Sequence, residues 1–143
     1  MMVLTKLDAA MHQLNVAIRL FVEEDYLSSL TLAGAAEGIL DGLCRRKGLP
    51  TAAEYIAEFH LEDTDSTLPD KARRGVIYAV LNNGRNQAKH ANLDGEDEVD
   101  VAQVHPLQML MRAVPMVRNL GAPSSKEIRE LYQWITDHPE AFE

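Results

Sequence analysis

The chain has 143 residues, of which 46% are hydrophobic, and a formal net charge of −8 at pH 7. This length is enough for one hydrophobic core and predicts a single domain over residues 1–143. The negative net charge disfavours general nucleic-acid binding, so DNA is not expected as a partner and any contact with RNA has to be local. The lone Cys44 excludes an internal disulfide, and a chain without a signal peptide or membrane-length apolar run is expected to be cytoplasmic, with no membrane partner.

The first part of the chain predicts three helices. Apolar residues spaced alternately by three and four predict a long helix over roughly residues 2–24. Asp25 can cap a second helix that ends in a basic turn before Gly48, and Thr51 with Glu54 forms a capping box for a short helix to about His60. The expected apolar faces are Leu4, Leu7, Met11, Leu14, Ile18 and Phe21, then Leu27, Leu30, Leu32, Ala36, Leu40 and Leu43, then Ala52, Tyr55, Ile56 and Phe59.

The second part predicts further helices. Pro69 suits the first turn of a helix expected to bury Ala72, Val76, Ile77, Val80 and Leu81. That helix is expected to end at residues 82–84, Asn-Asn-Gly, and to restart as residues 85–90. Residues 101–120 are apolar nearly all round, which indicates either the centre of a bundle or half of a dimer interface. Ser124 with Glu127 forms a capping box for a last helix that stops before Pro139.

No run of residues alternates with period two, so an all-α bundle of about five helices is the predicted fold. The sequence contains no phosphate-binding GxxxxGK[ST] or GxGxxG loop and no GxSxG nucleophile motif. No two histidines stand at the spacing of helical metal ligands. We therefore expect chemistry, if any, that uses neither a metal nor another cofactor.

Residues 85–90, Arg-Asn-Gln-Ala-Lys-His, are the candidate site. Arg85 can donate two hydrogen bonds to the oxygens of one phosphate, and His90 can exchange a proton near neutral pH. Asn86 adds a neutral donor and acceptor, and Lys89 a supporting positive charge. On an ideal helix Arg85 and His90 lie about 140° apart, whereas Asn86 and His90 share a face. A working site therefore requires the long Arg85 side chain to extend around the helix towards the face that carries His90.

A second candidate feature is Glu37, which stands among small residues at positions 33–38, Ala-Gly-Ala-Ala-Glu-Gly. Small residues allow another backbone to come close. One interpretation is that Glu37 pairs with Arg85 or orients His90. The other is that Glu37 is a partly exposed residue beside a tight helix crossing.

The spacing Arg85-Asn86-x-x-x-His90, within a small all-α chain, resembles the Arg-x(4 to 6)-His motif of HEPN domains. The strings at residues 32–37 and 89–90 are similar to those of bacterial proteins of this type. The resemblance implies a metal-independent endoribonuclease of a toxin-antitoxin or defence system, acting as a homodimer whose two motifs meet in one cleft. His90 would act as the general base or acid, Arg85 would stabilise the charge on the phosphate, and Asn86 would orient His90 or the phosphate. An antitoxin or another protein is then a candidate partner besides RNA.

The chain departs from the family at position 93, where Leu93 stands in place of a modifiable tyrosine found in some of these toxins. Regulation by nucleotidylation there is not suggested. Two alternatives to the ribonuclease stay open. One is a non-catalytic module of the same fold that binds a nucleotide, RNA or protein, which neutralisation of Arg85 by Glu37 would favour. The other is an unrelated helical interaction protein in which Arg85 and His90 are surface residues.

Overall fold

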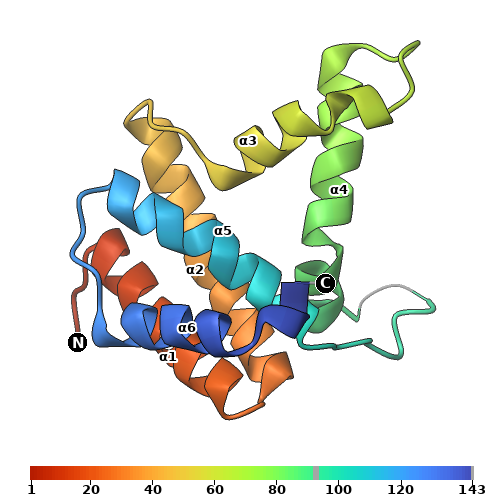
Figure 1. Ribbon diagram of the computed structural model, residues 1–143. Coiled ribbons are helices and arrows are strands. Elements are labelled where there is room, and N and C mark those ends of the chain that lie inside the picture. The colour runs from red at the N-terminus through yellow and green to blue at the C-terminus, as the bar shows by residue number, and fades with distance from the viewer. Residues whose placement is uncertain (92–93, 143) are drawn as a thin grey trace.

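The computed structural model describes residues 1–91 and 94–142, and Leu93 lies outside them. The described part contains helices and no strand, which confirms the all-α class, with six α-helices in place of about five. Figure 1 shows their arrangement. The elements are α1 (Lys6–Val22), α2 (Tyr26–Arg46), α3 (Ala52–Phe59), the 3₁₀ turn η1 (Leu61–Asp63), α4 (Asp70–Lys89), α5 (Val104–Asn119), α6 (Lys126–Asp137) and the 3₁₀ turn η2 (Pro139–Phe142).

Four helices form the body of the molecule. Helices α1 and α2 pack side by side, α5 packs on α2, and α6 lies along α1 (Figure 1). The predicted apolar stripes of α1 and α2 supply much of the core, because their spacing gathers apolar side chains on one face of each helix. The largest side chains with almost no exposure are Phe21, Leu14, Ile18, Leu30, Leu40, Leu110, Met116 and Leu131. Each such burial contributes about 1.5–3 kcal/mol.

Side-chain caps set several helix starts. The predicted Asp25 and Thr51 caps are confirmed, since their side chains accept hydrogen bonds from the backbone N–H groups of Ser28 and Glu54. For α6 the prediction is one residue early: Ser125, not Ser124, caps the helix. Its hydroxyl accepts from the backbone N–H of Ile128 at 3.2 Å and donates to Asn15 of α1 at 2.7 Å. The cap therefore also holds α6 against α1.

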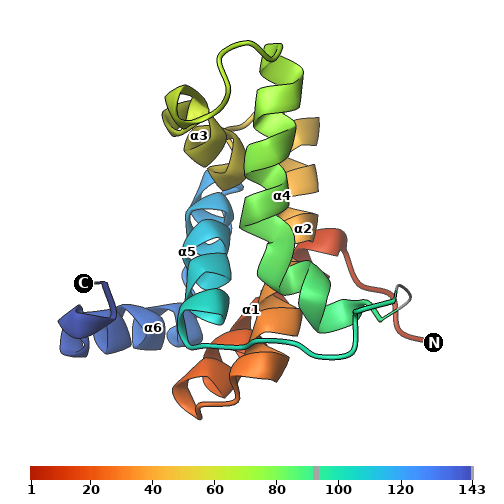
Figure 2. The same cartoon turned by 90° about the vertical axis from the view of Figure 1, so that its right-hand side faces the viewer.

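Helix α4 runs unbroken from Asp70 to Lys89, so the expected break at residues 82–84 is wrong. Figure 2 shows the continuous helix, with its axis bending over the last turns. Asparagine disfavours helices mainly by hydrogen bonding to its own backbone. Here the side-chain oxygen of Asn82 instead accepts from the Arg112 guanidinium, so it does not compete with the backbone bonds of α4.

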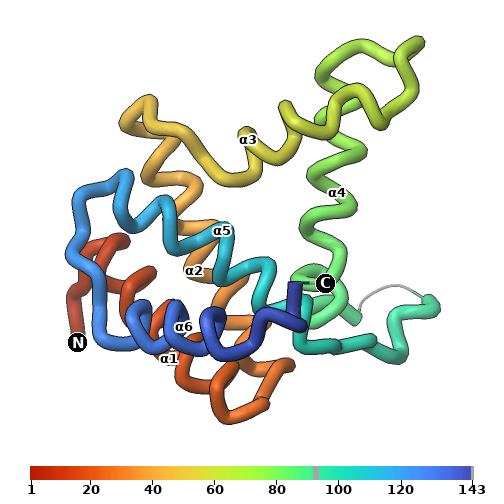
Figure 3. Tube along the Cα trace, viewed as in Figure 1, coloured from red at the N-terminus to blue at the C-terminus, as the bar shows by residue number. Residues whose placement is uncertain are grey.

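Helices α3 and α4 extend away from the body and form what we call the arm, residues 52–81 (Figures 1 and 3). Most of the apolar face predicted for α4 is not buried: Val76 and Val80 are 51% and 72% exposed, and among its five residues only Ile77 is buried. On α3, Tyr55 and Phe59 are 74% and 67% exposed. The prediction is wrong because, in the described part of the chain, no helix packs closely enough on these residues to cover them.

Candidate functional site

The candidate motif occupies the end of α4. Arg85 to Lys89 lie in the last helical turns, and His90 is the C-cap residue, with extended backbone at φ −123° and ψ 140°. The backbone N–H of His90 donates to the carbonyl of Asn86 at 3.1 Å. Arg85 is partly buried against α2, while Asn86, Lys89 and His90 are exposed. The motif therefore separates into one inward residue and three outward ones.

Arg85 lies across the glycines of α2. A Cβ atom built on Gly34 would be 2.6 Å from both Cγ and Cδ of Arg85, and one built on Gly38 would be 3.8 Å from Nη1 of the same side chain. A side chain at position 34 would thus collide with the aliphatic part of Arg85. The absence of a side chain at Gly34 therefore lets this arginine cross α2 closely.

Glu37 lies beneath this crossing and is only 2% exposed. Its Oε2 is 3.4 Å from Nη1 of Arg85, and its Oε1 accepts from Nη2 of Arg112 at 2.8 Å. Arg112 also donates to the carbonyl of Leu81 at 3.2 Å and to Asn82 at 3.4 Å. The expected pairing of Glu37 with Arg85 is confirmed, and Glu37 is buried rather than partly exposed.

Two buried side chains, Glu37 and Arg112, and two partly buried ones, Arg85 and Asn82, form what we call the Glu37 network. It joins α2, α4 and α5 at the base of the arm. A buried carboxylate needs a compensating cation, and removing one partner from such a group is strongly destabilising. The network therefore fixes how α4 meets the body.

Arg112 and Asn82 are not among the site residues predicted from sequence. The sequence does carry a signal for Arg112, because it is the one charged residue between Val104 and Val117 in a strongly apolar stretch. Arginine is almost never fully buried unless it is paired. Its 5% exposure and its ion pair with Glu37 match that rule.

In the described part of the chain, neither of the two cavities that Arg85 is found to line has His90 among its lining residues. Arg85 lines a polar pocket of about 390 Å³ together with Glu37, Asn82 and Arg112, and His90 is not among the lining residues. Within the described residues the His90 ring has no hydrogen bond or ion pair. Arg85 therefore has the surroundings of a structural ion pair, and His90 those of a surface residue.

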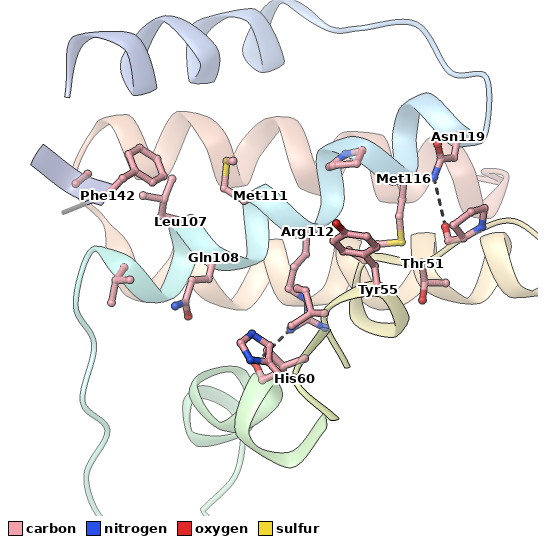
Figure 4. Close-up of a pocket in the computed structure, with 17 residues that line it drawn as sticks. Thr51, Tyr55, His60, Leu107, Gln108, Met111, Arg112, Met116, Asn119 and Phe142 are labelled. Carbon is pink, nitrogen blue, oxygen red and sulfur yellow. Dashed lines mark hydrogen bonds between the residues drawn. The ribbon is translucent and has the colours of Figure 1, made fainter. Parts of the chain in front are cut away.

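A larger hollow, the α5 groove, lies between α3 and α5 (Figure 4). Its volume is about 770 Å³, and its lining is mostly apolar. The face of α5 in the groove spans the whole helix, with successive residues spaced alternately by three and one: Val104, Leu107, Gln108, Met111, Arg112, Pro115, Met116 and Asn119. Tyr55 and His60 lie on the arm side, and Phe142 closes one end, as Figure 4 shows. No residue of the predicted motif lines this groove.

Neither a metal site nor a membrane span is found in the described ranges. Over residues 1–91 and 94–142, no three His, Cys, Asp or Glu side chains come together in a way that could hold a metal ion. In the same ranges, no helix combines the length and apolar character needed to cross a membrane. Cys44 is fully buried in the core, and burial raises the pKa of its thiol, so the protonated form is favoured at neutral pH.

Comparison of the chain with protein-family models, with curated proteins and with solved structures finds no match. The HEPN resemblance thus stays a prediction from the residues of the motif and from the all-α fold.

Proposed function

We propose that this chain is a non-catalytic, HEPN-like helical module that binds a protein partner. The observation that carries the proposal is the ion pair of Arg85 with the buried Glu37. Stabilising a phosphoryl transition state requires a cation directed at the charge that develops on the phosphate. Here the guanidinium is directed at a carboxylate of its own chain, and its side chain is only 21% exposed.

The α5 groove supports the binding part of the proposal. Soluble proteins rarely leave a long apolar surface open, and such surfaces mark sites of interaction. The groove is mostly apolar, and no residue of the motif lines it. An acidic chain with a net charge of −8 also repels the backbone of RNA, which favours a protein partner over a polynucleotide.

The test is an RNA cleavage assay. Labelled single-stranded RNA is incubated with the purified chain in the presence of a metal chelator, alongside the His90→Ala variant prepared in the same way. The proposal predicts that both leave the RNA intact to the same extent. Circular dichroism of both proteins shows that the comparison is between folded chains.

A second function, a metal-independent endoribonuclease of a toxin-antitoxin or defence system, is favoured by one observation. Asn86, Lys89 and His90 are exposed together at the end of α4, where a polynucleotide can reach them. In this mechanism His90 takes the proton of a ribose 2′-hydroxyl, and Arg85 turns from Glu37 to the phosphate while Arg112 stays paired with the carboxylate. Cleavage that disappears in folded His90→Ala would select this function and overturn the first.

A further inference from the structure

We infer that the partner in the α5 groove is a second copy of this chain, with the arm of each copy lying in the groove of the other. The inference rests on the proposed function, because it names the occupant of the same groove. It follows from three properties of the described residues: the groove, the exposed faces of the arm, and the match between them.

The groove requires an elongated apolar occupant. Its α5 face runs from Val104 to Asn119, which is about 22 Å of helix axis at 1.5 Å per residue. The opposite face of α5 is already covered by α2. A helix that is apolar on both sides in this way is normally covered on both sides, so α5 lacks one neighbouring helix.

The arm carries the surfaces that such an occupant needs. Tyr55 and Phe59 are one helical turn apart on α3, and Val76 and Val80 are one turn apart on α4. All four are exposed although their spacing is that of a buried helix face. Val80 also lines a cavity of about 150 Å³ that shares Leu81 and Gln108 with the α5 groove, so Val80 lies close to the groove.

The exposed area is that of a dimer interface. The large exposed apolar side chains of the arm and the groove are Tyr55, Phe59, Val76, Val80, Val104, Met111 and Phe142. Judged by their exposed fractions, they present on the order of 700 Å², since a whole aromatic side chain alone covers roughly 150–250 Å². A stable interface of standard size buries about 800 Å² of each partner.

A second copy is the occupant that uses all of this surface. A two-fold axis brings the same patch of both subunits together, so a ridge and a groove on one molecule are each matched by the other copy. Within the groove Arg112 has little water to lose, because it is already buried and paired within its own chain.

The test measures the mass of the chain in solution by analytical ultracentrifugation. Wild type is expected to sediment as a dimer. Val80→Glu on the arm and Met111→Lys in the groove are each expected to sediment as monomers, because each would bury an unpaired charge. The matched control is Val22→Glu, an exposed valine of α1 that is 46% accessible and far from the arm in sequence, and it should remain dimeric.

An equimolar mixture of Val80→Glu and Met111→Lys gives the sharpest result. In a mixed dimer one arm–groove contact is wild type, and the other brings the two introduced charges, which have opposite signs, into the same contact. Dimers should therefore reappear in the mixture. A monomeric wild type would overturn the inference and leave the RNA result untouched. Dimers that survive Val80→Glu, or a mixture that stays monomeric, would overturn the arm–groove pairing.

Discussion

At the scale of single residues, the two ends of the candidate motif have different physical settings. Arg85 crosses Gly34 and meets the buried carboxylate of Glu37, whereas His90 ends α4 in solvent. Both residues lie near the same end of α4, but their surroundings differ. Arg85 contacts α2 and Glu37, whereas His90 is exposed to solvent. Their proximity in sequence therefore does not make them one chemical unit within a single chain.

The Glu37 network gives the first prediction. Replacing Glu37 by Gln leaves the Arg112 guanidinium, which is 5% exposed, without a counter-charge, and we expect a loss of about 3–5 kcal/mol in the free energy of unfolding. The matched control is Glu127→Gln, which removes the partner of Arg19 in a surface ion pair and should cost at most about 1 kcal/mol. Urea denaturation followed by circular dichroism measures both. Equal losses would show that the network is not structural.

Gly34 gives the second prediction. A methyl group there meets Arg85 at 2.6 Å, so Gly34→Ala should lower the free energy of unfolding by about 1–3 kcal/mol. In Gly42→Ala the new methyl group meets nothing within 4 Å, and that variant should gain up to about 1 kcal/mol from helix propensity. Adding Arg85→Gly to Gly34→Ala should remove the clash. The double variant still lacks the ion pair between Arg85 and Glu37. A Gly34→Ala protein as stable as Gly42→Ala would contradict the close crossing.

At the scale of elements, most helix starts and the core-facing stripes of α1 and α2 could be predicted from sequence. Caps and periodicity are local signals, and Asp25 and Thr51 act locally. The continuity of α4 could not be predicted, because it depends on Arg112 from α5 engaging Asn82. The exposure of Val80 and Tyr55 could not be predicted for another reason: periodicity shows which residues suit burial, not whether the same chain covers them.

The cap of α6 gives an element-scale prediction. Ser125→Ala removes a bond to the backbone of Ile128 and another to Asn15, so the free energy of unfolding should fall by about 1 kcal/mol or slightly more. Ser124→Ala is the control, because its exposed side chain forms no hydrogen bond among the described residues and its removal should have little effect. Thermal unfolding of the two variants side by side measures the difference. If Ser124→Ala lost more free energy of unfolding than Ser125→Ala, the cap would be Ser124, as predicted from sequence.

At the scale of the whole molecule, a compact body carries an arm whose apolar faces it does not cover (Figure 1). The Glu37 network holds the base of the arm, and the α5 groove lies beside it. This arrangement places Arg85 in an ion pair of the fold, and it is the basis of our proposal that the groove binds another chain. Under this proposal the motif is not catalytic, whereas the sequence resemblance predicts a ribonuclease.

The measurement that tests this account most directly is the fate of single-stranded RNA incubated with the intact chain, in whatever assembly it forms, under metal chelation. The account predicts that RNA stays full-length and that wild type and His90→Ala are indistinguishable. Cleavage by wild type that is absent with folded His90→Ala would contradict the account and restore the motif as an active site.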